Sequence, residues 1–202
     1  ATQGRAFWIM DDLHLIHQYM EKKPWDMHLF KPANAFQMGG STKTSLTAGE
    51  NHSGGVRVHY YLEKEPEKSD TISLKFLDPD GKVIRTFSTH PGKGEGELPE
   101  PKVGTNLFVW DMKYPKADKF DGMLMWWGTL EGPLAPPGSY AVDLFKGRKR
   151  YGFSQKFDIL MDPRSEGTKE DLNALGEKVV HKRTDNGDDA MLRERKKEVD
   201  FS

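Results

Sequence analysis

The chain has 202 residues, and 30 lysines and arginines balance 31 aspartates and glutamates to a formal net charge of −1. This length allows one sizeable domain with extensions, and the balanced charge gives no electrostatic preference for nucleic acid or a membrane surface. The absence of cysteine excludes a disulfide framework, a thiolate nucleophile and a Cys-ligated metal site. No apolar run could span a bilayer and no charged-then-apolar leader is present, so we expect a soluble protein, or a mature one whose signal has been removed.

Residues 1–38 predict an arm and linker. Ala6–Met10 is a short apolar run closed by acidic residues, which is typical of a strand followed by a polar turn. Leu13–Met20 has weak helical spacing, and we interpret residues 11–38 as an extended connector held in place by its aromatic side chains. Because Ala1 is followed almost at once by an apolar strand, we expect the chain to continue something upstream.

Residues 39–163 predict a β-sandwich of about seven strands. Residues 39–55 are rich in Gly, Ser, Thr and Asn, which favours a loop or a weak edge strand. Alternating apolar and polar residues indicate strands over 56–62, 72–76, 83–87, 106–111, 140–145 and 153–159. In the last of these we expect Phe153, Phe157 and Ile159 to share one face. Residues 89–104 predict a long loop, and residues 115–131 a long insertion.

The stretch Gly132–Leu144 is the most informative about fold. Pro136, Pro137 and Gly138 predict a rigid turn, and Tyr140 begins a strand directly after it. This pattern is typical of the tyrosine corner of β-sandwiches, in which the ring enters the core and the hydroxyl bonds to backbone a few residues upstream. The alternative is a surface loop that leads into an ordinary strand.

The fold class that we predict is mainly β: an immunoglobulin-like (fibronectin III-like) antiparallel β-sandwich with an extended N-terminal arm and short charged C-terminal helices. The helices belong to residues 164–202, a charged tail with helical composition. Thr168 could cap the first helix, and the second has little apolar face, so it would be marginal alone.

The order of the segments supports a family resemblance. Residues 56–62, 71–88, 104–111 (with Trp110 and Asp111) and 132–144 together resemble the immunoglobulin-like module of flagellar hook-capping proteins and of many secreted bacterial C-terminal domains. Residues 4–13 (GRAFWIMDDL), followed by residues 28–32 (HLFKP), are similar to the C-terminal part of large bacterial proteins of the neuraminidase-repeat (BNR) "glycosyl hydrolase" or sortilin-type β-propeller kind. The resemblance covers about residues 4–163 and departs from the family after Arg164.

This resemblance implies that the first motif is the last strand of an upstream β-propeller, the second a linker, and the rest an appended sandwich in a secreted, periplasmic or cell-envelope protein. The Ser-x-Asp-x-Gly-x-Thr-Trp boxes of such propellers are absent from this chain. If the parent protein has a glycosidase site, it lies elsewhere. We therefore expect no catalytic residues and no cofactor here, and an accessory module that docks on or follows a propeller.

The best candidates for ligand or partner binding are Phe120, Trp126 and Trp127. Adjacent tryptophans in one loop cannot both enter a single sheet core, so at least one ring could stack on a sugar or insert into a partner protein. The alternative is a hydrophobic plug, completed by Met123 and Met125, that closes one end of the sandwich. Carbohydrate binding through this loop is the second function we consider, and part of a glycosyl hydrolase the third.

A separate candidate is Phe7, Trp8 and Ile9, which could donate a strand to an open propeller edge. Such a strand would place the module directly against a propeller in the same or another chain.

The titratable residues indicate neither a catalytic pair nor a metal site. A glycosidase needs two facing carboxylates, and Asp111, Asp121 and Glu131 border the insertion, yet nothing in the pattern separates two pKa values. We expect Asp111 to cap its strand instead. His14 and His17 lack a third defined metal ligand. Asp78–Gly81 lacks the further ligands of a calcium loop and predicts a turn. No metal is expected.

Overall fold

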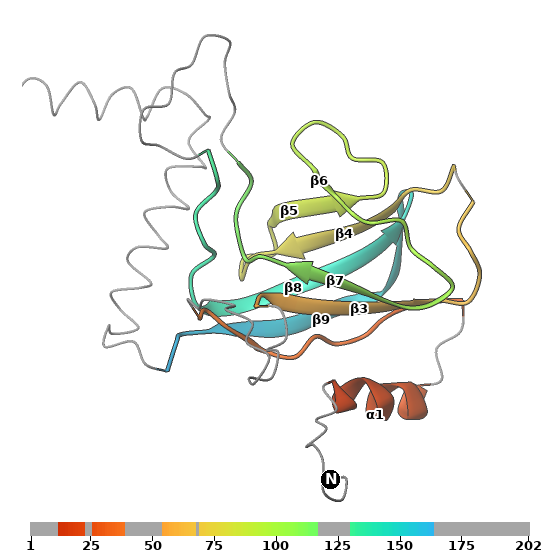
Figure 1. Cartoon of the computed structure of the whole chain (residues 1–202), viewed down its shortest axis with the longest axis horizontal. Coiled ribbons are helices and arrows are strands. Elements are labelled where there is room, and N and C mark those ends of the chain that lie inside the picture. Colours follow the sequence, from red (N-terminus) through yellow and green to blue (C-terminus); the bar gives the residue numbers. More distant parts are fainter. Residues whose placement is uncertain (1–11, 23–25, 39–53, 68, 117–129, 164–202) are drawn as a thin grey trace, which may run out of the picture.

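A computed structural model describes residues 12–22, 26–38, 54–67, 69–116 and 130–163 (Figure 1). Strands make up 47% of these residues and helix 8%, so this part of the chain is mainly β, as predicted. In chain order the elements are α1 (Leu13–Lys22), β1 (Met27–Leu29), β2 (Ala35–Phe36), β3 (Val56–Leu62), β4 (Ile72–Leu77), β5 (Val83–Ser88), β6 (Gly96–Glu97), β7 (Gly104–Trp110), β8 (Gly138–Lys146) and β9 (Lys149–Leu160).

The strands form two sheets. One has three strands in the order β1-β3-β7, and the other has six in the order β2-β9-β8-β4-β5-β6. Neighbouring strands are antiparallel, apart from β2 with β9 and β5 with β6, which are parallel. The β4–β5 connection is the predicted Asp78–Gly81 turn, in which the Asp78 carboxylate accepts from the backbone amides of Asp80 (3.0 Å) and Lys82 (2.8 Å).

The two sheets share one core. Trp110 of β7 and Phe76 of β4 come from different sheets, are fully buried, and have ring centroids 4.4 Å apart. The other large aromatic rings of the core surround this pair: Phe87, Phe108, Tyr140 and Phe157. Because alternate residues of each strand point to the same side, the apolar half of each pattern builds this core.

A tight turn follows β7, and the residues after it pair with the backbone of the segment that precedes β8. The indole nitrogen of Trp110 donates to the carbonyl of Lys113 (3.2 Å), and the amide of Lys113 donates to the Asp111 carboxylate (3.1 Å), so Asp111 caps its strand as expected. Opposite this turn, a Cβ on Gly132 would collide with the backbone carbonyl of Tyr114. Only glycine fits there.

The corner before β8 has the expected hydrogen bond. Tyr140 is buried against Trp110 and Phe157, and its hydroxyl donates to the backbone carbonyl of Pro136 at 2.7 Å. Pro137 and Gly138 complete the turn, so the ring in the core and the rigid corner are held together by one side chain.

Two short strands lie within the segment that we interpreted as a connector. β1 pairs with β3 through Met27 and Leu29, and β2 pairs with β9 through Ala35. An unpaired connector over residues 11–38 is therefore wrong for these residues, because strands of two or three residues are too short to show an alternating pattern. β6 was missed in the predicted loop 89–104 for the same reason.

β9 contains a bulge that the sequence pattern does not reveal. Leu144 pairs with Tyr151 and Val142 with Gln155, so β9 has two extra residues opposite Asp143. Gly152 in this bulge has φ of +75°, and Phe153 is 84% exposed. The prediction that Phe153 shares the buried face of Phe157 and Ile159 is thus wrong, because the bulge changes the alternation.

Several predictions concern residues outside the described part of the chain: the strand of Phe7, Trp8 and Ile9, the loop of Phe120, Trp126 and Trp127, and the charged helices of residues 164–202. Among the described residues, the single helix is too short and too polar to cross a membrane.

Candidate functional site

Helix α1 lies against the outer face of the three-stranded sheet, on the side away from the core (Figure 1). On β3 this face carries Arg57, His59 and Tyr61, the polar half of the predicted alternation. Phe30, which follows β1, is only 2% exposed but does not belong to the core between the sheets. Its amide donates to the carbonyl of His59 at 3.0 Å, which places Phe30 opposite His59 on the outer face. The outer face is therefore partly buried.

Electrostatic contacts attach the start of α1 to β3. Asp12, the residue before the helix, lies 2.5 Å from the guanidinium of Arg57 and 3.6 Å from Nε2 of His59. Asp12 has φ of +58°, a conformation that aspartate tolerates better than most residues. Ion pairs that are mostly shielded from water are stronger than exposed ones, and the Asp12 and Arg57 side chains are each about one-fifth exposed.

The middle of α1 is attached by neutral contacts. The Gln18 side chain exchanges two hydrogen bonds with the backbone of Lys31, donating to its carbonyl (3.1 Å) and accepting from its amide (2.8 Å). The Tyr19 ring meets Tyr61 edge-on, with 6.3 Å between centroids. α1 therefore contacts the sheet through Tyr19 and the preceding Asp12, and Gln18 binds the segment after β1. The partly buried side of the helix carries His14, Leu15 and Gln18 and is largely polar.

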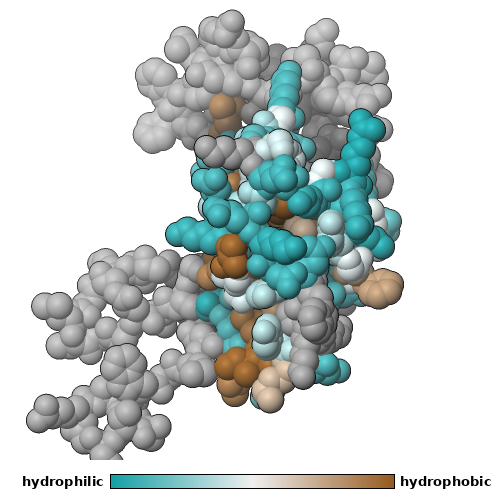
Figure 2. Space-filling model, turned by 90° about the vertical axis from the view of Figure 1, so that its right-hand side faces the viewer, coloured by the Kyte–Doolittle hydropathy of each residue, from teal (hydrophilic) through white to brown (hydrophobic). Residues whose placement is uncertain are grey.

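The apolar side of α1 faces outward. Leu13, Ile16 and Met20 follow the i, i+3, i+7 spacing of one helix face, and they are 50%, 46% and 70% exposed. We call these three residues the α1 stripe. Figure 2 shows hydrophobic side chains at the lower end of the molecule, the end at which α1 lies in Figure 1. An amphipathic helix normally turns its apolar side to the protein, so this orientation is reversed within the described part of the chain.

The environment of His59 beneath α1 disfavours its charged form. Burial lowers the pKa of His59, and the positive charge of Arg57 and the nearby His14 lower it further, while Asp12 partly opposes them. Nε2 of His14 is buried without a hydrogen-bond partner. His59 and His14 thus belong to one cluster with Asp12 and Arg57.

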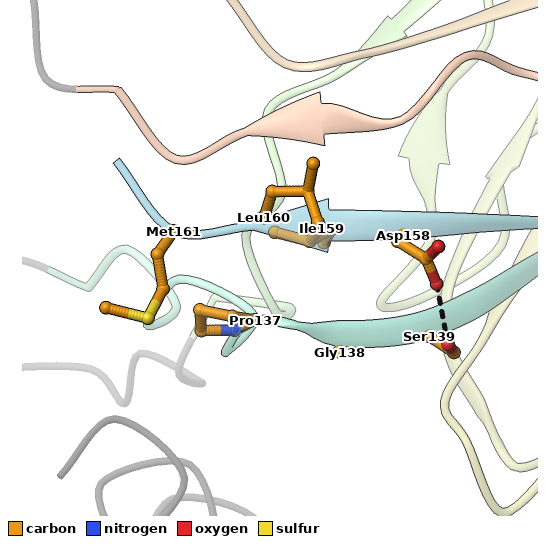
Figure 3. A pocket seen from close by; sticks show the side chains of 7 residues that line it. All are labelled: Pro137, Gly138, Ser139, Asp158, Ile159, Leu160 and Met161. Carbon is orange, nitrogen blue, oxygen red and sulfur yellow. Dashed lines mark hydrogen bonds between the residues drawn. The ribbon is translucent and has the colours of Figure 1, made fainter. Parts of the chain in front are cut away.

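A pocket lies where β8 begins and β9 ends. This pocket of about 370 Å³ is lined by Pro137, Gly138, Ser139, Asp158, Ile159, Leu160 and Met161 (Figure 3). The Ser139 hydroxyl donates to Asp158 at 2.6 Å at one end, and Pro137 and Met161 lie at the other. Its lining includes one carboxylate, that of Asp158, which also accepts from the Asn34 amide at 3.4 Å. A single engaged carboxylate does not make an acid/base pair.

The carboxylates beside the insertion are engaged in structural contacts. Asp111 caps its strand, and Glu131 forms an ion pair with the Lys113 ammonium, which lowers the pKa of Glu131. A glutamate with a lowered pKa is a poor general acid at neutral pH. Asp121, the third candidate, lies outside the described residues. Among the described residues, no group of three His, Cys, Asp or Glu side chains could hold a metal ion.

The structure gathers a different set of residues from those singled out in the sequence. Of the predicted residues, Trp110, Asp111, Pro136, Pro137, Gly138 and Tyr140 lie around one corner of the core. The binding candidates lie outside the described part. Sequence reasoning missed Arg57 and His59, although their alternation with buried valines was visible, because a polar outer face alone indicates solvent and not a covering helix.

A scan against protein-family models finds no match, and no curated protein matches the chain at a significant level.

Proposed function

We propose that this chain is a non-catalytic, immunoglobulin-like β-sandwich module that docks on a β-propeller. The strand order supports the fold assignment. If β3, β4, β7, β8 and β9 correspond to strands B, C, E, F and G, the sheets read A-B-E and G-F-C-C′, with β1 and β2 as two halves of strand A. The tyrosine corner then lies at the start of strand F, where such domains carry it.

The observation that carries the docking proposal is the reversed orientation of α1. The helix uses its polar side to attach to the sandwich and leaves Leu13, Ile16 and Met20 exposed, which costs hydrophobic free energy unless a second surface covers them. The occupant that we propose is the β-propeller, because α1 follows directly on residues 4–12, whose sequence resembles a last propeller strand. In this arrangement the propeller supplies any chemistry, and the module holds its partner in place.

Limited proteolysis tests this function. The chain is digested alone and with the β-propeller polypeptide that co-purifies with it from its native source, and cleavage within residues 1–22 is followed by mass spectrometry. We expect cleavage to slow by at least about tenfold in the complex, because a docked segment must first dissociate to be cut. Equal cleavage with and without the propeller, or a chain that is found alone at its source, contradicts the proposal.

A further inference from the structure

We propose that the contact between α1 and the three-stranded sheet is an acid-sensitive latch, in which protonation of His59 releases the helix. The inference rests on the proposed function in one respect: the released helix is the one that carries the docking stripe. The latch itself is a property of this chain alone and can be measured without a partner.

One carboxylate, that of Asp12, has two neighbours that are or can become positively charged. Arg57 already pairs with Asp12 at 2.5 Å, and His59 approaches the same carboxylate oxygen at 3.6 Å. With His59 neutral, Asp12 and Arg57 give this site one negative and one positive charge. Protonation of His59 would add a second positive charge beside a single anion that is already paired with a guanidinium.

The surroundings of His59 offer no second anion among the described residues. The groups that share its face are Asp12 and His14 from the α1 segment, Arg57 and Tyr61 from β3, His28 and Phe30 from the β1 segment, and Thr105, Leu107 and Val109 from β7. Asp12 is the only carboxylate in this set.

His14 lies in the same cluster, and its Nε2 atom is buried without a hydrogen-bond partner. Moving α1 away from the sheet exposes the His59 imidazole to water, where its charged form is solvated. Acid therefore favours the detached state.

Detachment also unfolds the helix. α1 has ten residues and ends at Lys22, and isolated helices of this length are marginal in water. The Gln18 and Tyr19 contacts are lost with the sheet, and little holds the turns together afterwards. The stripe of Leu13, Ile16 and Met20 would then no longer form one ordered surface, so release would also weaken docking.

The sign of the pH dependence follows from the direction of the pKa shift. The pKa of His59 is lowered in the attached state below its ordinary value of 6.5. The attached state thus binds fewer protons than the detached state, and its stability is fully present above a pH of about 6.5. The stability falls as the pH drops below that value and stops falling below the lowered pKa of the attached state.

Hydrogen–deuterium exchange on the full chain, without a partner, tests the latch. Exchange of the α1 amides is followed at a pH of about 7.5 and about 5.5, and protection factors are corrected for the intrinsic rates at each pH. We expect α1 protection to fall by about tenfold at the lower pH, the effect of one proton over one pH unit, while the amides of β4 and β8 keep theirs. Equal α1 protection at the two pH values overturns the proposal.

Two variants give the test its controls. The double variant His14→Gln/His59→Gln should remove the loss of protection at low pH, whereas His17→Gln, on the exposed side of the same helix, should retain it. If the double variant still loses α1 protection at low pH, the proposal is overturned. If the double variant does not fold, Asp12→Asn serves instead, and it should release α1 at both pH values. If α1 protection in Asp12→Asn equals that of the unmodified chain, the latch is also overturned.

The two proposals fail separately. If α1 protection does not depend on pH, but the stripe is still needed to bind the propeller at neutral pH, the latch is excluded and the docking function stands. If α1 protection depends on pH, but the chain does not bind the propeller, the docking function is excluded and the latch stands.

Discussion

Tyr140 connects the rigid corner to the core through one side chain. Its ring stacks on Phe157 with 6.2 Å between centroids, and its hydroxyl reaches back to Pro136. The residues of this corner could be assigned from the sequence because turn residues and a following aromatic are a local pattern. The Asp12–Arg57–His59 cluster could not, because Asp12 is 45 or more residues away from Arg57 and His59 in the chain and meets them only once α1 lies on β3.

The hydroxyl of Tyr140 can be removed without removing the ring. Tyr140→Phe leaves the Pro136 carbonyl without this donor, and we expect the free energy of unfolding to fall by about 1 kcal/mol. Chemical denaturation followed by circular dichroism measures this change. Tyr19→Phe, on the exposed surface of α1, is the control and should change it by less than about 0.5 kcal/mol. A Tyr140→Phe chain as stable as the control contradicts the role of the corner.

The buried tyrosines predict instability in alkali. Burial raises the pKa of Tyr60 to about 12, and burial together with neighbouring groups raises the pKa of Tyr140 as well. Because these pKa values are higher in the folded state, their stabilisation is complete below pH 10.0 and is lost as the pH rises through the folded values. Absorbance at the tyrosinate band should show at least two of the six tyrosines titrating late and together with unfolding. Six equivalent titrations near the ordinary value would refute this.

At the scale of elements, long strands could be predicted and short ones could not. β3, β4, β7 and β8 each show at least three alternations, whereas β1, β2 and β6 have two or three residues and depend on partners distant in the chain. α1 gave only a weak signal, because its apolar residues face outward and its contact side is polar. Local periodicity thus reveals strands that are long enough to alternate. Shorter strands are defined only by their pairing with strands distant in the chain.

The bulge in β9 separates two phenylalanines that the pattern places together. Phe153→Ser should change the free energy of unfolding by less than about 0.5 kcal/mol, because the ring is 84% exposed. Phe157→Ala should lower it by about 3 to 5 kcal/mol, since Phe157 is buried among Trp110, Phe76 and Tyr140. Urea unfolding of the two variants compares them directly. Similar losses in both would place Phe153 in the core and contradict the bulge.

At the scale of the whole molecule, the two sheets share the core, and we propose that α1 is the part that meets a partner. The core is buried from both sheets, while the helix is held to the outer face by an ion pair, two hydrogen bonds and one ring contact. A weakly attached helix with an exposed apolar stripe is suited to binding, because covering it removes apolar area from water on both sides.

This division of roles predicts that stability and binding can be separated. Replacing the stripe with serine in the triple variant Leu13→Ser/Ile16→Ser/Met20→Ser should leave the melting temperature of the sandwich unchanged, because none of the three side chains enters the core. Differential scanning calorimetry measures this. A large fall in the melting temperature would show that the stripe packs within the chain and does not serve a partner.

The most direct test of the proposed docking is the affinity of the chain for any β-propeller polypeptide that co-purifies with it, measured by isothermal titration calorimetry at neutral pH. The account predicts that the triple stripe variant binds at least tenfold more weakly, about 1.4 kcal/mol or more of lost binding free energy. It also predicts that Val83→Ser, which removes an equally exposed apolar side chain on β5, binds like the unmodified chain. Equal affinity of the triple variant and the unmodified chain would contradict docking through α1.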